Sequence, residues 1–195
     1  NVEGWFLMKS ALLIGSALLV SALPSAASAE PVLLISIDGL QPDDVIEADN
    51  RGIDIPNLKR FITQGSYAQG VRGVLPTVTY PSHATLITGV SPSRHGIFGN
   101  NSFDPLQINQ GGWYWYATDF RVPTLWDIAA KAKLTTANVH WPVSVNASAV
   151  KWNIPQIWRT GHADDAKLLK SLATPGLIES LESQLGEYAP GIDES

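Results

Sequence analysis

Directly after position 30 the chain carries a nearly continuous apolar run, PVLLISI at residues 31–37, which ends at Asp38-Gly39. β-branched residues are frequent in this run, and polar residues do not alternate with apolar ones. This pattern is typical of a strand that is buried on both faces, as in a parallel sheet. The run therefore predicts an α/β fold that contains a parallel sheet.

Helices and further strands are predicted to alternate after this run. Residues 55–62 form a short amphipathic pattern that stops at Gly65, and residues 81–87 begin with a proline and precede Gly89. Helical patterns recur at 124–132, 163–172 and 175–185, and strand patterns occur at 68–75 and 135–141. Strands that alternate with helices predict a doubly wound, mostly parallel α/β sheet.

The N-terminal residues have the pattern of a bacterial secretory signal peptide. Met8-Lys9 precede an apolar core at 11–23, and the small residues at 27–29 form a typical cleavage site. The core is shorter than the roughly 20 apolar residues that span a bilayer. We expect a signal peptide at 8–29, non-native upstream residues at 1–7, and a periplasmic or secreted mature chain without a stable membrane span. The alternatives are an uncleaved anchor or a buried helix.

The composition limits which chemistry and which partners are open to the chain. Cysteine is absent, so the chain has neither disulfides nor thiolate ligands. A metal site would therefore use Asp, Glu, His or a hydroxyl. The formal net charge of -5 and the absence of a basic run argue against bulk binding of nucleic acid.

Asp38 stands where the first predicted strand ends. In an open α/β sheet, ligands bind at the carboxyl ends of the strands. A carboxylate at this place is a suitable ligand for a divalent cation, and Gly39 allows a tight turn beside it. The alternative is that Asp38-Gly39 is simply a turn, because this dipeptide is common in turns.

Thr79 precedes the helix predicted at 81–87 and lies close to its N-cap. The hydroxyl could cap the helix by accepting a backbone N–H. It could instead attack a phosphate, since free N–H groups and the positive end of the helix dipole favour an alkoxide and a phosphate. A cation held by Asp38 would assist, because metal coordination lowers the pKa of a bound hydroxyl. The residues alone leave both roles open.

Several short motifs follow one another in the order seen in a known family. They are the strand with Asp38-Gly39, Pro56-Asn57-Leu58, PTVTYPSH at 76–83, Thr88-Gly89, Pro92, His95-Gly96-Ile97, Asn100, Asp104-Pro105, Trp126 and Trp141-Pro142. In this order they resemble the nucleotide pyrophosphatase/phosphodiesterase (type I phosphodiesterase) family of the alkaline-phosphatase superfamily. The resemblance covers the whole chain after the signal peptide and implies an alkaline-phosphatase-like fold.

The resemblance also implies roles for four residues. Asp38 and Thr79 would both ligate one Zn²⁺ of a two-zinc site, and Thr79 would be the nucleophile that forms a phospho-threonine intermediate. Asn100 would donate its amide to a phosphate oxygen, and Tyr80 would flank the substrate. The implied substrate is a small-molecule phosphodiester or nucleotide. From the residues alone, Asn100 could equally belong to a turn and Tyr80 could pack in the core.

Other aromatic residues and histidines carry weaker hypotheses. His83 lies one helical turn after Thr79, and a supporting or core role is a better interpretation than a catalytic pair. The aromatic stretch 113–116 either walls a substrate pocket or covers the edge of a core. His140 and His162 have no ligand-like spacing.

The sequence departs from the family in its metal ligands. The family completes its zinc sites with a D-x-x-x-H motif, an Asp-His pair and a further His, whereas here no Asp precedes a His by four residues or by one. We therefore expect residues 30–195 to be the N-terminal part of a truncated catalytic domain, inactive by itself. The alternatives are a phosphomonoesterase or phosphonate hydrolase of the same superfamily, or a noncatalytic secreted binding module. A sulfatase is a less favoured alternative, because Thr79 stands where sulfatases carry the cysteine that becomes formylglycine, and the chain has no cysteine.

Overall fold

The computed structural model describes residues 30–106, 108, 112–158 and 164–186. The chain divides into two compact units, residues 1–37 and 38–195. The predicted signal peptide and His162 lie outside the described residues, and only residues 30–37 of the first unit are described. The described part of the chain has no helix long and apolar enough to cross a membrane.

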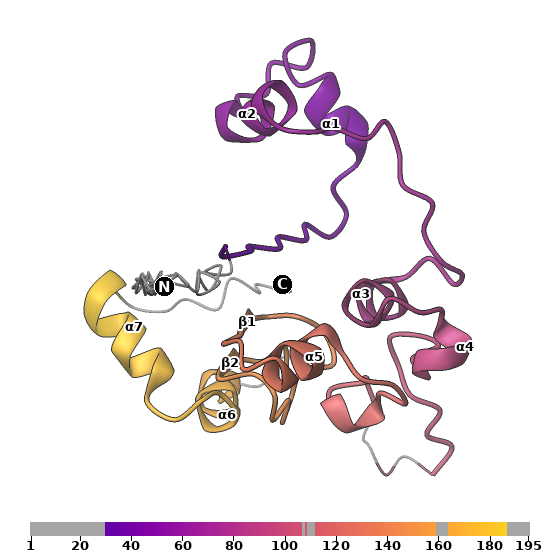
Figure 1. Cartoon of the computed structure of the whole chain (residues 1–195), viewed down its shortest axis with the longest axis vertical. Coiled ribbons are helices and arrows are strands. Elements are labelled where there is room, and N and C mark those ends of the chain that lie inside the picture. Colours follow the sequence, from indigo (N-terminus) through magenta and orange to yellow (C-terminus); the bar gives the residue numbers. More distant parts are fainter. Residues whose placement is uncertain (1–29, 107, 109–111, 159–163, 187–195) are drawn as a thin grey trace, which may run out of the picture. The chain divides into compact units, whose positions relative to one another are not determined.

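Helices make up most of the regular structure in the second unit, and one small sheet accompanies them (Figure 1). The helices are α1 (Pro42–Ile46), α2 (Pro56–Gln64), α3 (Thr79–Thr88), α4 (Pro92–His95), the 3-10 turn η1 (Ala117–Asp119), α5 (Leu125–Lys131), α6 (Asp165–Leu172) and α7 (Leu177–Leu185). The predicted helices are confirmed as α2, α3, α5, α6 and α7. The sequence did not predict α1 and α4, because each is about one turn long and too short to show a helical period.

The sheet consists of two short parallel strands, β1 (Ala137–Val139) and β2 (Trp152–Ile154). β1 lies inside the strand predicted at 135–141, whereas β2 is too short to carry a sequence signal. Asn138 and Asn153 stand opposite each other and are both buried. The Nδ2 of Asn138 donates to the Oδ1 of Asn153 at 2.7 Å. An amide pair thus replaces the apolar contact that usually fills such a position.

Two predicted strands are absent from this structure. Residues 31–37 and 68–75 belong to no strand, and apolar side chains in them are exposed, to 91% for Val32 and 84% for Leu75. A strand buried on both faces needs neighbouring strands and covering layers, and the one sheet among the described residues joins only β1 and β2. The two strand predictions are therefore wrong here, whereas the combination of helices with a parallel sheet is confirmed.

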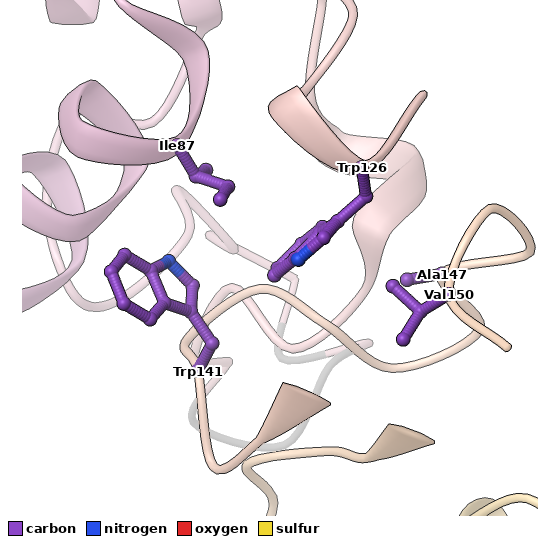
Figure 2. Packing of buried hydrophobic residues seen from close by; sticks show 5 residues of the cluster. All are labelled: Ile87, Trp126, Trp141, Ala147 and Val150. Atoms are coloured by element: carbon purple, nitrogen blue, oxygen red, sulfur yellow. The ribbon is translucent and has the colours of Figure 1, made fainter. Parts of the chain in front are cut away.

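α3 and α5 pack against each other beside two tryptophans (Figure 2). Ile87 of α3 and Trp126 of α5 point toward Trp141 of the loop after β1, and Ala147 and Val150 complete the cluster. Tryptophan buries a large apolar area, and burial of such area is the main favourable contribution to folding. This cluster therefore links the second half of α3 to the sheet.

Two further clusters complete the core. One joins the first half of α3 to the segment after α4 and to the loop after β1; its buried members are Tyr80, Ala84, Ile97 and Val143. The other joins α6 and α7 to β2; its buried members are Ile154, Leu169, Ala173 and Ile178. α3 is consequently packed along its whole length.

Candidate active site

Thr79 occupies the first position of α3. The preceding residue, Val78, is the N-cap and has no side-chain oxygen to bind a backbone N–H. Pro81 suits the first turn because its φ is fixed near the helical value, although it has no N–H to donate. Gly89 ends the helix in the left-handed conformation, with a φ of 69°. The helix predicted from this proline and glycine is confirmed.

The hydroxyl of Thr79 donates a hydrogen bond to Asp38, with 2.9 Å between Oγ1 and Oδ2, although 41 positions separate the two residues. Gly39 has a φ of 74°, so the turn after Asp38 uses a conformation that glycine adopts readily. Asp38 is exposed and Thr79 is half-buried. The structure thus brings together the two residues that the sequence singled out, and the hydroxyl binds a carboxylate instead of capping the helix.

Asn100 is held beside the start of α3 by its side chain and its main chain. Its Oδ1 accepts the backbone N–H of Tyr80 at 3.0 Å, and its carbonyl oxygen accepts the N–H of Tyr114 at 3.0 Å. The bond from an N–H group fixes the orientation of the amide, because only the oxygen can accept it. No described residue accepts a hydrogen bond from Nδ2 of Asn100. This nitrogen is therefore a fixed donor next to the peptide that joins Thr79 and Tyr80.

In the first turn of α3, the N–H of Thr79 is the backbone donor that could bind a ligand. The N–H of Tyr80 binds Asn100, and Pro81 has none. The N–H of Thr79 has no hydrogen-bond partner in the described part of the chain. Together, this N–H and the Nδ2 of Asn100 are the neutral donors that an anion near the Thr79 hydroxyl would meet.

The ring of Tyr80 is fully buried. It packs edge-on against Trp113 at 5.3 Å and Trp115 at 6.3 Å between ring centroids, and these indoles stack on each other at 5.6 Å. Trp158, which the sequence did not connect with this region, contacts both indoles at 5.1 and 4.8 Å. The stretch 113–116 was expected either to wall a substrate pocket or to cover the edge of a core. This packing agrees with the second interpretation.

The phenol of Tyr80 has no exposed surface to offer a ligand. Burial raises its pKa far above the ordinary value, and its Oη has no hydrogen-bond partner among the described atoms. The phenol therefore stays neutral at physiological pH. Its ring supports the backbone that binds Asn100.

Two histidines make polar contacts with groups of α3, His83 from within the helix and His95 from α4. The Nδ1 of His83 lies 2.8 Å from the carbonyl oxygen of Thr79. His95 is fully buried; its Nδ1 accepts the N–H of Ile97 at 3.1 Å, and its Nε2 lies 3.1 Å from Oγ1 of Thr85. Burial lowers the pKa of His95, and a hydrogen bond with the backbone of Pro81 raises it to a smaller extent. A neutral His95 thus links α4 to the helix that begins with Thr79.

The described residues provide only some of the ligands that a metal site needs. The described residues contain no group of three His, Asp or Glu side chains that could hold a metal ion. Asp38 and Thr79 contribute two oxygen atoms at 2.9 Å from each other, and such oxygen ligands suit a divalent cation. The pair therefore fits two positions around one cation.

The family model for type I phosphodiesterase/nucleotide pyrophosphatase matches residues 32–183. The match covers most of the chain and includes Asp38, Thr79 and Asn100. The chain belongs to this family. The resemblance inferred from the ordered motifs is thereby confirmed.

Individual relatives of this type I phosphodiesterase family member are found in mammals and snakes. Ectonucleotide pyrophosphatase/phosphodiesterase family member 3 of Rattus norvegicus is 28% identical over 144 residues, which are 70% of this chain and 15% of that protein. The venom phosphodiesterase of Naja atra is 30% identical over 136 residues, 66% of this chain and 16% of that protein. The chain thus spans less than a fifth of the length of these relatives.

Proposed function

We propose that this chain carries the nucleophile of an exported, metal-dependent hydrolase that cleaves phosphodiester or pyrophosphate bonds in small molecules, nucleotides included. The hydrogen bond between Thr79 and Asp38 is the observation that carries the proposal. It joins a hydroxyl at a helix N-terminus to a carboxylate that can share a cation with it. The names of the relatives, a venom phosphodiesterase and an ectonucleotide pyrophosphatase/phosphodiesterase, support the same class of reaction.

In the proposed reaction, Oγ1 of Thr79 attacks phosphorus. The bond between Oγ1 and phosphorus forms while the bond from phosphorus to the leaving oxygen breaks, and the hydroxyl proton is released to solvent. The product is a phospho-threonine. The leaving oxygen takes up a proton from solvent. Water then attacks the same phosphorus, the bond from phosphorus to Oγ1 breaks, the hydroxyl of Thr79 recovers its proton, and the phosphoryl group leaves with the oxygen of the water. Before the attack, the carboxylate of Asp38 orients Oγ1 through the hydrogen bond already present.

Asn100 and the N–H of Thr79 are proposed to bind the phosphoryl oxygens. Both are neutral donors, and the bond from Tyr80 to Oδ1 holds the amide of Asn100 beside the peptide of Thr79. Donors that are already in place stabilise the negative charge of a transferring phosphoryl group without reorganisation. Tyr80 enters the proposal as the support of Asn100, because its ring is buried.

A zinc ion bound by Asp38 and Thr79 would favour the alkoxide and offset phosphate charge. We propose these two residues as ligands of one ion in the two-zinc arrangement that the sequence implied. Two oxygen ligands from the described part of the chain make a weak site, because tight zinc sites use at least three protein ligands. We therefore expect weak zinc binding by this chain.

The proposal extends to a larger sheet and to export. A doubly wound sheet would require residues 31–37 and 68–75 to become hydrogen-bonded strands, and the apolar, β-branched composition of 31–37 favours the first of them. The pattern at 8–29 favours removal of a signal peptide and a periplasmic or secreted location.

Orthovanadate tests the proposal, because it mimics a phosphoryl group during transfer. We expect vanadate with zinc to shift the NMR signals of the Thr79 backbone amide and of the Asn100 side-chain amide in the full chain. Thr79→Ala and Asp38→Asn should each weaken the vanadate affinity by about tenfold, since each removes a contact to the cation or the anion.

Thr77→Ala is the matched control for Thr79→Ala. Thr77 is exposed, lies two positions before Thr79, and donates its hydroxyl to the carbonyl oxygen of Val74. This variant should bind vanadate as the wild type does. Equal vanadate responses from the wild type, Thr79→Ala and Asp38→Asn would contradict the proposal.

A further inference from the structure

We infer that His83 is a positioning residue for Thr79: its ring fastens the first turn of α3 and thereby holds the hydroxyl that meets Asp38. The observation is the distance of 2.8 Å between Nδ1 of His83 and the carbonyl oxygen of Thr79. The inference deepens the proposed function and rests on it, since it gives a task to the neighbour of the proposed nucleophile.

The first turn of α3 lacks the usual means of stabilising a helix start. Val78 has no side chain that caps, and Pro81 brings no N–H. The N–H of Thr79 has no partner among the residues that the structure describes. Helix ends without caps fray. The turn therefore depends on contacts from other side chains, of which Asn100 provides one through the N–H of Tyr80.

His83 provides a second contact from within the helix. Side chains on a helix point toward its N-terminus, so a ring four positions after Thr79 reaches the carbonyl oxygen of that residue. A carbonyl oxygen only accepts hydrogen bonds, so Nδ1 must carry the proton in this contact. The contact thus selects one tautomer of the neutral imidazole.

Trp141, in the loop after β1, packs against the His83 ring. The ring is 8% exposed and meets Trp141 edge-on, with 5.1 Å between ring centroids and 79° between ring planes. Trp141 belongs to the cluster that joins α3 and α5 (Figure 2), and its backbone N–H binds Oδ1 of Asn138 in β1 at 3.1 Å. A continuous series of contacts therefore runs from β1 through Trp141 and His83 to Thr79.

This arrangement explains how Thr79 keeps one geometry although it is half-buried and its partner Asp38 is exposed. The hydrogen bond between the two side chains is open to water, where such bonds contribute little. Loss of the His83 contact would leave the first turn with the hydrogen bond to Asn100 and the buried ring of Tyr80, and without a contact to the carbonyl oxygen of Thr79 from a side chain. The side chain of Thr79 would then sample several rotamers instead of the one that faces Asp38.

Two substitutions separate positioning from packing. In His83→Asn the amide nitrogen takes the place of Nδ1, whereas in His83→Gln it takes the place of Nε2. We expect three-bond NMR couplings of Thr79 in the full chain to report one rotamer in the wild type and in His83→Asn, and averaged rotamers in His83→Gln. Amide exchange of Ser82, whose N–H binds the carbonyl of Val78, should be roughly fivefold faster in His83→Gln, as expected for one lost hydrogen bond.

Leu86→Gln is the control for placing glutamine in α3, because Leu86 is 57% exposed in the same helix. It should leave the Thr79 couplings unchanged. In the wild type, the chemical shifts of the ring nitrogens should show the proton of His83 on Nδ1. A proton on Nε2 would overturn the inference, whether or not the variants fold, and so would equal behaviour of His83→Asn and His83→Gln.

These measurements do not depend on phosphate chemistry. Failure of vanadate to perturb Thr79 would contradict the proposed function and leave the tautomer and the couplings as they are. Conversely, a correct vanadate response together with an Nε2 tautomer of His83 would retain the proposed function and exclude His83 as its positioning residue.

Discussion

Side chains of Asn100, His83 and His95 make polar contacts with α3. Asn100 accepts the N–H of Tyr80, His83 contacts the carbonyl oxygen at the first position, and His95 contacts Thr85. Each contact needs one amide orientation or one imidazole tautomer. The helix start is therefore sensitive to pH and to substitutions that preserve size but move a donor.

His95 makes the stability of the fold depend on pH. Burial lowers its pKa from the ordinary value of 6.5, so the folded chain binds fewer protons than the unfolded chain. The stabilisation is fully present above about pH 6.5 and is lost as the pH falls toward the folded pKa. Burial also lowers the pKa of His140, which adds an effect of the same sign.

We expect a smaller free energy of unfolding at about pH 5.5 than at about pH 7.5, measured by urea denaturation. His95→Gln removes the titrating group and should flatten this part of the pH dependence, even though the variant is less stable at both values. The prediction is contradicted if the free energy of unfolding of the wild type stays constant or rises from about pH 7.5 to about pH 5.5. Protonation of His95 would then not destabilise the folded chain.

Among the elements, α5 ends in a defined backbone motif. The N–H of Lys133 binds the carbonyl of Ala130, and the N–H of Leu134 binds the carbonyl of Ala129, both at 2.9 Å. These are the two bonds of a Schellman motif, in which the residue after the C-cap adopts the left-handed conformation. Lys133 does so with a φ of 59°, where glycine would be less strained.

Lys133→Gly should therefore raise the free energy of unfolding by about 0.5–1 kcal/mol. The exposed Lys131, the last residue of α5, is the matched control, since glycine inside a helix costs up to about 1 kcal/mol. The two lysine-to-glycine changes thus have opposite expected signs in urea denaturation. Destabilisation by both would show that the lysine side chain at 133, and not its backbone strain, decides the outcome.

β1 and β2 depend on a buried amide pair. Asn153 accepts from Asn138 and donates its Nδ2 to the carbonyl oxygen of Ser144 at 2.8 Å. Asn153→Ala leaves both partners unsatisfied and opens a cavity, so we expect a loss of about 2–4 kcal/mol in the free energy of unfolding. Asn57→Ala, at an exposed position of α2, should change it by less than about 0.5 kcal/mol. Similar effects of both changes would contradict a stabilising role of the buried pair.

For the whole molecule, we expect the number of metal ligands to limit the proposed catalysis. The described residues provide Asp38 and Thr79 and no group of three His, Asp or Glu side chains. We expect no sustained hydrolysis of bis-p-nitrophenyl phosphate by the 195-residue chain with added zinc, measured as released nitrophenolate. Turnover that Thr79→Ala abolishes would show that residues outside the described ranges complete the site.

Local signals were sufficient to predict the longer helices, whereas of the observed strands only β1 lies in a predicted one. α3 carries its own start and stop residues, Pro81 and Gly89, and α5 begins with a capping box made by Thr124 and Asp127. A helix also satisfies its backbone hydrogen bonds within one segment. A strand needs a partner from another part of the chain. The apolar run at 31–37 has the composition of a buried strand and no ladder in this structure, whereas β2 has a ladder and no signal.

The candidate site divides in the same way. The sequence pointed to Asp38, Thr79 and Asn100 through turn chemistry, a helix start and ordered family motifs. In the structure, the hydroxyl of Thr79 donates to Asp38, and the N–H of Tyr80 donates to the side chain of Asn100. Tyr80 was assigned to the substrate from its position beside Thr79, and the structure buries its ring. Their catalytic roles remain predictions until vanadate binding is measured.

By itself, the sequence determined the family, the positions of the longer helices and the placement of Thr79 at a helix N-terminus, because these depend on residues that are near one another in the chain. Only the tertiary structure decided that Thr79 donates to a carboxylate 41 positions away and that the amide oxygen of Asn100 accepts the N–H of Tyr80. Hydrogen bonds between distant segments depend on how those segments pack, and packing is a property of the whole chain.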